Sequence, residues 1–390
     1  MRKNPYCIVS DKCCIISLLP IENNAVMNRH THKGKRDEGP VRYPGEGDLK
    51  PHTNNSLHKL AICILTSART FLPFLTIPAM CISCTEYITD DTAPCEVILT
   101  KAEGTDLETL DLFFYDDDKQ ARLDAYQRFT LSGENSVHGI SRTGRKTAVG
   151  ICNFDDGKYT WTDINSLKSI SSLKSFLDED DPARPVMSGT GTLKAGNDVR
   201  MSMNLRPLMS EVVLRSVRCD FSSRTYRDEK LRDVRIYLTN VCSAWPVLKD
   251  TLSSSSDYIN IGRADSSQIS IMKHPEYIYR KLSSDIDARG TRPDLHFYCY
   301  PNVAKEESMG SPFTRIVIEG TLQGNKYYYP LSVNRRNDGT GVERNTVYVL
   351  DVVLTRRGTT DPDTAVDTET AQVSVTTRKW NEKDTQNVCF

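Results

Sequence analysis

The sequence predicts an all-β protein built from β-sandwiches. Many short segments alternate apolar and polar residues with a period of two, which is typical of half-buried strands in antiparallel sheets. Turn-forming residues separate most of them, as at 155–157 and 337–339. Helical periodicity is confined to one stretch, 161–177. So many strands with so little helix favour sandwiches over a doubly wound sheet.

The individual elements follow from these patterns. We expect one short helical insertion over 161–177, where apolar residues recur every three or four positions and Asp163 is a candidate N-cap. The expected strands are 110–115, 147–152, 199–205, 212–217, 234–238, 295–300, 314–318, 326–333, 346–355 and 371–377.

The chain length and one serine run suggest how these elements are divided. At about 150 residues per domain, 390 residues correspond to two or three domains. The run Thr251–Asp257 contains four consecutive serines, which cannot contribute to a core. We therefore predict an N-terminal β-sandwich over 95–250 and a C-terminal one over 258–390.

Residues 58–83 have the pattern of an export signal. A basic flank precedes an apolar core that ends at Ile82-Ser83-Cys84, and a cysteine directly after the cut is typical of bacterial lipoproteins. We predict lipidation at Cys84, a spacer over 84–94, and a non-native upstream extension over 1–57 that arises from a wrong start. The alternative is a buried helix with Cys81 and Cys84 as a redox or metal pair, although two prolines interrupt that segment.

The charge distribution agrees with export. The chain has 50 Lys and Arg against 51 Asp and Glu, and residues 1–83 hold 11 of the basic and 6 of the acidic ones, which leaves 39 against 45 from Cys84 onward. An acidic body predicts no nucleic-acid partner, and attachment to a membrane would have to come from the lipid. No apolar run reaches the length of about 18 residues that a membrane-spanning helix needs.

Residues from Cys84 onward show no catalytic motif, and the sequence predicts no enzyme, cofactor or metal site. The segment Gly189–Lys194 resembles part of a phosphate loop but lacks its third glycine, so it indicates a turn. The acidic runs match no calcium loop and are predicted to be solvated. They lie at 116–118, 178–181 and 361–363, and the histidines of this part of the chain are His138, His274 and His296.

Two further groups of residues leave alternatives open. Tyr298, Tyr300 and Tyr327–Tyr329 could form a carbohydrate-stacking surface, which would make the protein a lipid-anchored carbohydrate-binding module, but aromatic residues are equally common in buried strands. Six cysteines besides Cys84 are widely spaced, and any disulfide connectivity among them stays undetermined.

Several segments, taken in order, resemble the fimbrillin superfamily. The start of the exported part, from Cys84 through Asp90-Asp91 to Pro94-Cys95, resembles that of mature FimB-like anchor subunits. Segments similar to fimbrillins in general are Leu231–Asn240, Gly310–Gly320, Lys326–Pro330, Leu354–Asp363 and Trp380.

This resemblance implies a subunit of a type V pilus with two transthyretin-like β-sandwich domains. Such subunits are exported as lipoproteins to the outer membrane and joined to other fimbrial subunits by donor-strand exchange, and some contact a surface receptor. Residues 371–377 are a candidate donated strand, or simply the last strand of their own domain. Shaft subunits lose an N-terminal strand to an arginine-specific protease, whereas anchors keep it. We expect an anchor or another minor subunit, with a shaft or tip role as the alternative.

Overall fold

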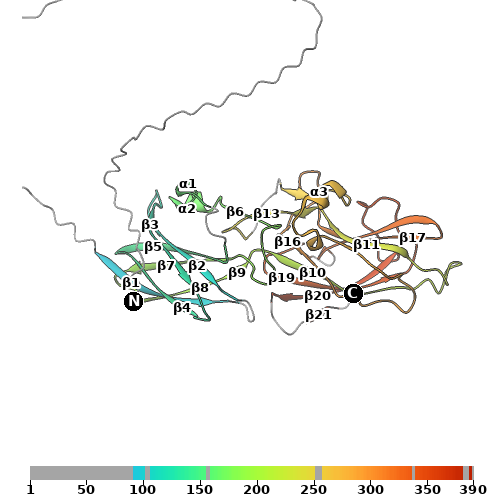
Figure 1. Cartoon of the computed structure of the whole chain (residues 1–390), viewed down its shortest axis with the longest axis horizontal. Coiled ribbons are helices and arrows are strands. Elements are labelled where there is room, and N and C mark those ends of the chain that lie inside the picture. Colours follow the sequence, from blue (N-terminus) through green and yellow to red (C-terminus); the bar gives the residue numbers. More distant parts are fainter. Residues whose placement is uncertain are drawn as a thin grey trace, which may run out of the picture. The chain divides into compact units, whose positions relative to one another are not determined.

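The computed structural model describes residues 91–101, 106–154, 159–250, 257–335 and 339–380, and the backbone of 386–388. Strands dominate these residues, and the helices are short, which confirms the predicted all-β class. Two sets of packed sheets are present, the first in cyan to green and the second in yellow-green to red in Figure 1.

The first set combines a three-stranded sheet, β4-β1-β8, with a five-stranded sheet, β3-β2-β5-β7-β9. Apolar side chains of β1, β2 and β8, among them Val97, Leu112 and Met203, meet in one core between the sheets. The strands are β1 (Thr92–Thr100), β2 (Thr109–Asp116), β3 (Leu123–Thr130), β4 (Ser136–Arg142), β5 (Gly144–Cys152), β7 (Met187–Ala195), β8 (Arg200–Asn204) and β9 (Arg206–Pro207).

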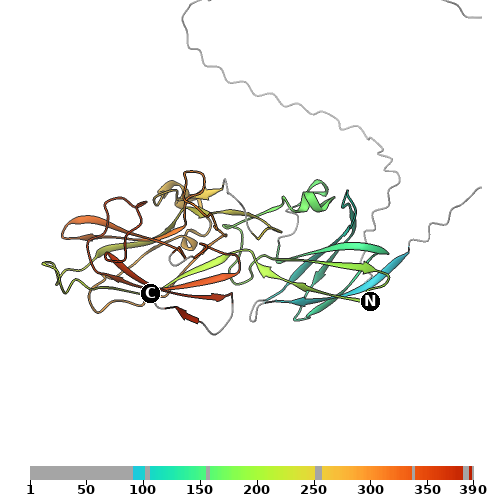
Figure 2. The same cartoon turned by 180° about the vertical axis from the view of Figure 1, so that it is seen from behind.

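The second set combines the sheet β16-β10-β19-β20-β21 with the sheet β15-β11-β17-β18. Figure 2 shows β20 and β21 from behind, near the C-terminal end. The strands are β10 (Ser210–Cys219), β11 (Arg232–Thr239), β15 (Tyr279–Lys281), β16 (Leu295–Cys299), β17 (Arg315–Leu322), β18 (Asn325–Ser332), β19 (Thr346–Leu354), β20 (Ala371–Lys379) and β21 (Gln386–Val388).

Two small ribbons and a few helical turns complete the described elements. The ribbons pair β12 (Val241–Cys242) with β14 (Tyr258–Ile259) and β13 (Ala244–Pro246) with β6 (Lys174–Phe176). The helical turns are α1 (Trp161–Ile164), α2 (Leu167–Ile170), α3 (Ser266–Ile271) and the 3-10 turn η1 (Pro275–Tyr277). None of the helices within the described residues has the length and apolar character needed to cross a bilayer.

Strand β2 is buried on both faces, which explains its nearly continuous apolar sequence. Leu112 and Phe114 point into the core of the first set of sheets, whereas Phe113 and Tyr115 point into the other large core. Ile164 and Ile170 of α1 and α2 belong to that second core as well. The turns α1 and α2 therefore cover the outer face of the sheet β3-β2-β5-β7-β9.

The predicted helical insertion is two separate turns rather than one helix over 161–177. Thr160 is the N-cap of α1, and Asp163 is the N3 residue whose carboxylate accepts a 2.6 Å hydrogen bond from the Thr160 amide. The prediction of Asp163 as the N-cap was therefore wrong, because the N-cap lies three residues earlier, at Thr160. Ser166 caps α2, and residues 174–176 leave the helical path to form β6.

All ten predicted strands are present, but pairing changes earlier than the serine run suggested. Strand β10 pairs with β16 and β19, and β11 pairs with β15 and β17, so these long strands take partners in the C-terminal half, whereas the short β13 pairs with β6. The domain limits 95–250 and 258–390 stay a prediction. Likewise, β1 begins at Thr92, inside the spacer predicted over 84–94.

Candidate functional site

Strand β1 occupies the centre of the three-stranded sheet. It pairs antiparallel with β4 from Thr92 to Ile98 and parallel with β8 from Glu96 to Thr100. Cys95, Val97 and Leu99 alternate along it and are 2, 0 and 4% exposed. Removal of β1 would separate β4 from β8 and expose an apolar groove, so this strand holds the first sandwich closed.

The outward side of β1 carries one charged residue, Glu96, which is tied to β8. The Glu96 carboxylate accepts a 2.6 Å hydrogen bond from Nε of Arg200, and this bond is the main reason that the pKa of Glu96 is lowered. One face of β1 is apolar and the other carries Glu96. A shift of one residue in register would turn Glu96 into the core, so only one register is favourable.

The last long strand, β20, is built into its own sheet. It pairs with β19 along its whole length, from Ala371 opposite Leu354 to Lys379 opposite Thr346. Val373 is buried there, and β21 pairs on its other side. In this structure the candidate donated segment 371–377 therefore completes the second set of sheets.

The predicted lipidation site, Cys84, lies outside the described residues, as do the signal peptide at 58–83 and the extension at 1–57. The cysteines that the structure describes are all buried and carry free thiols. Burial raises the pKa of the Cys219 thiol to about 12, which suppresses its reactivity. The described cysteines are Cys95, Cys152, Cys219, Cys242 and Cys299.

The acidic run 178–181, predicted to be a solvated loop, is partly internal. Asp180 is 2% exposed and accepts hydrogen bonds from the Val186 amide at 2.8 Å and the Tyr300 hydroxyl at 3.2 Å. Asp178 accepts 2.8 Å bonds from the amides of Lys273 and His274. These carboxylates attach a loop of the first set of sheets to the second, which explains why Asp180 is buried.

The tyrosines of the carbohydrate-stacking alternative do not form a common surface. Tyr300 and Tyr329 are fully buried, and Tyr298 lies on β16 whereas Tyr327 and Tyr328 lie on β18 of the other sheet. The Tyr298 ring lies 5.3 Å from that of Tyr277, within the protein's own packing. Their arrangement fits core strands rather than a sugar-binding face.

The three histidines of this part of the chain are equally dispersed. His296 Nδ1 lies 2.6 Å from a Glu211 oxygen, and this hydrogen bond raises the pKa of His296. His274 stacks on Tyr277 at 4.8 Å and lies 3.1 Å from Glu276, while His138 is on β4. Each histidine has its own local setting, and no two of them share a site.

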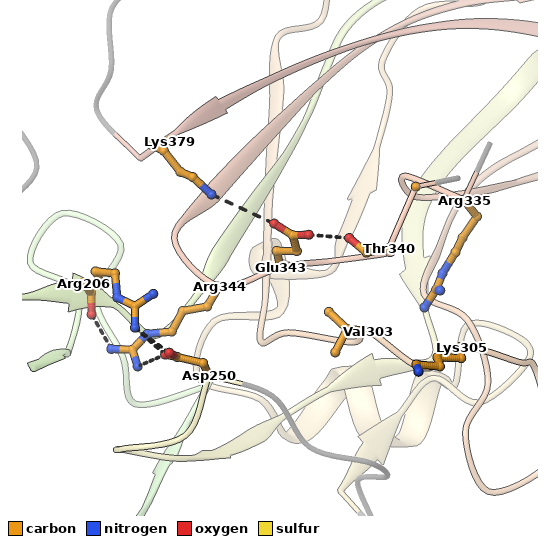
Figure 3. Close-up of a pocket in the computed structure, with 10 residues that line it drawn as sticks. Arg206, Asp250, Val303, Lys305, Arg335, Thr340, Glu343, Arg344 and Lys379 are labelled. Carbon is orange, nitrogen blue, oxygen red and sulfur yellow. Dashed lines mark hydrogen bonds and ion pairs between the residues drawn. The ribbon is translucent and has the colours of Figure 1, made fainter. Parts of the chain in front are cut away.

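A cleft of about 480 Å³, which sequence reasoning missed, is lined mainly by charged side chains (Figure 3). Its residues come from β9, from the segment after β13, from the connections after β16 and β18, and from the end of β20. We call it the cationic cleft. It is lined by Arg206, Asp250, Val303, Lys305, Arg335, Gly339, Thr340, Glu343, Arg344 and Lys379.

One side of the cationic cleft holds two guanidinium groups, those of the buried Arg344 and the half-exposed Arg206, around the carboxylate of Asp250. Asp250 accepts 2.6 Å bonds from Arg206 and a 3.1 Å bond from Arg344. Burial lowers the pKa of Arg344 to about 10, and the nearby charge of Arg206 adds to this effect. Burial acts to raise the pKa of Asp250, but its two arginine neighbours outweigh that and lower it.

The opposite side holds Arg335 and Lys305. Arg335 donates to the carbonyl oxygens of Ala304 and, at 3.0 Å, of Asn302, and its guanidinium lies 3.9 Å from the centre of the Phe313 ring. These contacts fix the guanidinium without neutralising it. No local signal in the sequence marks either side, because the residues that meet here are far apart along the chain.

The class of protein defined by this architecture is an all-β protein of packed, mostly antiparallel sheets, and solved structures share it. A protein described as a cell adhesion protein from Bacteroides eggerthii DSM 20697 is 15% identical, with a TM-score of 0.56 over 74% of this chain and 96% of that one. A second, from Parabacteroides distasonis ATCC 8503, is 13% identical, with a TM-score of 0.57 over 76 and 99%.

A fimbrilin from Porphyromonas gingivalis W83 is 16% identical, with a TM-score of 0.55 over 74% of this chain and 97% of that one. No family model and no curated protein matches the sequence. The chain therefore has the fold of fimbrillins, and the resemblance predicted from its sequence is confirmed at the level of the fold.

Proposed function

We propose that this protein is a structural subunit of a cell-surface fimbria, held at the outer membrane by a lipid on Cys84 and joined to other subunits by exchange of β-strands. The observation that carries the proposal is the position of β1. It is the first strand of the described residues, and its three inward apolar side chains close a sandwich in the way that an extended segment of matching pattern closes one in strand exchange.

The arginine distribution favours the anchor over a shaft subunit. No arginine occurs between Cys84 and Arg122, and Arg122 lies beyond β2, with its carbonyl oxygen bonded to the Asp116 amide at 2.9 Å. An arginine-specific protease therefore has no site at which it could release β1 alone. A subunit that keeps β1 also keeps the segment that leads to Cys84, as an anchor requires.

Donation of the last long strand, β20, would disrupt its own sheet. Because β20 is paired on both sides within its own sheet, donation of that strand would require the loss of nine residue pairs with β19. Strand β1 is paired on both sides as well, at seven positions with β4 and at five with β8, so in this structure both strands complete their own sheets. A subunit that keeps β1 keeps this groove filled, so exchange with another subunit requires either that it donates a strand or that β1 is displaced.

The test is mass spectrometry of the mature protein together with isolation of assembled fimbriae. The wild type should begin at an acylated Cys84 and should pellet with outer membranes and with other subunits. Cys84→Ala should remove the acyl mass and release the protein from membranes, whereas Cys81→Ala serves as the matched control and should change neither. A wild-type protein that starts before Cys84 without a lipid would contradict the anchor assignment.

A further inference from the structure

The side chains that line the cationic cleft carry more positive than negative charge. Five of its side chains are cationic and two are carboxylates, which leaves an excess of three positive charges in a chain whose net charge is −1. Clefts with one sign of charge focus the field of the protein and attract ligands of the opposite sign. The excess is distributed unevenly within the cleft.

Lys379 and Glu343 form an ion pair at 4.0 Å and balance each other, and the Thr340 hydroxyl donates a hydrogen bond to the Glu343 carboxylate (Figure 3). Arg206 and Arg344 share the carboxylate of Asp250, so this side retains one positive charge. The remaining two belong to Arg335 and Lys305. The imbalance is therefore largest on the side of the cleft away from Asp250.

Arg335 is prepared for an anion by the way it is held. Two of its five N–H groups are engaged by main-chain carbonyl oxygens, and one face rests on Phe313. No carboxylate of the described residues forms an ion pair with Arg335 or with the exposed Lys305 beside it. A guanidinium with a fixed plane and free N–H groups matches the two oxygens of a carboxylate.

We propose that the cationic cleft binds an acidic peptide segment of another protein, with one carboxylate at Arg335 and Lys305 and a second toward Arg206. The side chains between the two ends, Val303 and Thr340, suit an extended main chain. The lining includes no aromatic ring on which a sugar could stack. A volume of about 480 Å³ accommodates a few residues, so the segment is short.

The test measures binding of fluorescently labelled hexaglutamate to the full chain by anisotropy at low ionic strength. Hexaglutamate should bind, hexaglutamine should not, and binding should weaken as salt is added. Lys305→Glu should weaken binding roughly tenfold, because it reverses a charge at the more cationic end. The matched control is Lys168→Glu, which makes the same charge change at an exposed lysine of α2 and should leave the Kd within about twofold.

Arg335→Lys gives an independent measurement, since it keeps the charge but removes the fork that holds a carboxylate, and it should also weaken binding. Circular dichroism establishes that each variant is folded, and Lys305 is exposed enough for its substitution to be tolerated. The proposal is overturned if hexaglutamate does not bind, if both lysine variants weaken binding equally, or if tetragalacturonate or inorganic phosphate competes as well as hexaglutamate does. None of these outcomes depends on lipidation or strand exchange.

Discussion

Arg344 donates hydrogen bonds from Nη2 to both oxygens of Ser188, at 3.0 Å to the hydroxyl and 3.1 Å to the main chain. The two residues belong to different sets of sheets, since Ser188 is in β7 and Arg344 precedes β19. Nε of the same guanidinium bonds the carbonyl oxygen of Pro207 at 2.9 Å. One buried side chain therefore holds β7, β9 and the start of β19 together.

Replacement of this side chain should destabilise the protein strongly. Arg344→Met would leave several buried carbonyl oxygens without a donor and Asp250 with one arginine instead of two. Arg344 is only 4% exposed, so we expect the free energy of unfolding to fall by about 3–5 kcal/mol. Urea denaturation measures this free energy. The control is Arg227→Met, which removes an exposed ion pair with Asp228 and should change the free energy of unfolding by less than about 0.5 kcal/mol. Equal midpoints for the two variants would contradict this role.

Position 189 requires glycine because the main chain of β8 lies too close to leave space for a side chain. A Cβ atom there would lie 2.4 Å from the carbonyl oxygen of Asn204 in β8, which cannot move away as a side chain can. We expect Gly189→Ala to lower the free energy of unfolding by about 1–3 kcal/mol. The control is Gly310→Ala, at a site with open space around it. If thermal denaturation shows the same loss for both, close packing of β7 against β8 is not the reason for the glycine.

This glycine also shows where sequence reasoning failed. The segment Gly189–Lys194 was predicted to be a turn, but it lies within β7, a strand of nine residues. Glycine is a local turn signal, whereas the contact with β8 that requires it is set by the tertiary fold. The ten strands that were predicted have a local signal, the alternation of apolar and polar residues, and all of them are present.

The candidate site was less accessible to sequence reasoning than the fold. Strand β1 was divided between a predicted spacer and a domain, because Thr92–Pro94 look like a linker until β4 is placed beside them. The cationic cleft brings Arg206, Asp250 and Arg344 together across 44 and 94 positions of the chain. Charged residues at such separations carry no pattern, so only the folded chain reveals them.

The inward apolar side chains of β1 should determine whether the strand stays paired with β4 and β8. Val97 is fully buried, and Val97→Asp would place a carboxylate in an apolar core, which costs several kcal/mol. We expect a lysine-specific protease to cut after Lys101 and release β1 much faster in this variant, as followed by mass spectrometry. Ile98→Asp is the matched control, because the neighbouring side chain points to the other face. Equal rates of release would show that β1 is not held by its inward side chains.

The pair of His296 and Glu211 should make stability depend on pH. Because the Glu211 hydrogen bond raises the pKa of His296, the pair stabilises the folded state fully below the unfolded value of about 6.5, and this contribution is lost as the pH rises through the folded value. The His296 ring is 43% exposed, so solvent screens the pair and its effect is small. We expect His296→Gln to lower the free energy of unfolding by about 0.5 kcal/mol more at pH 5.5 than at pH 8.5. Urea denaturation at both pH values measures the difference. Glu211→Gln should show the same dependence, and a loss that is equal at the two pH values for both variants would rule out the pair as its source.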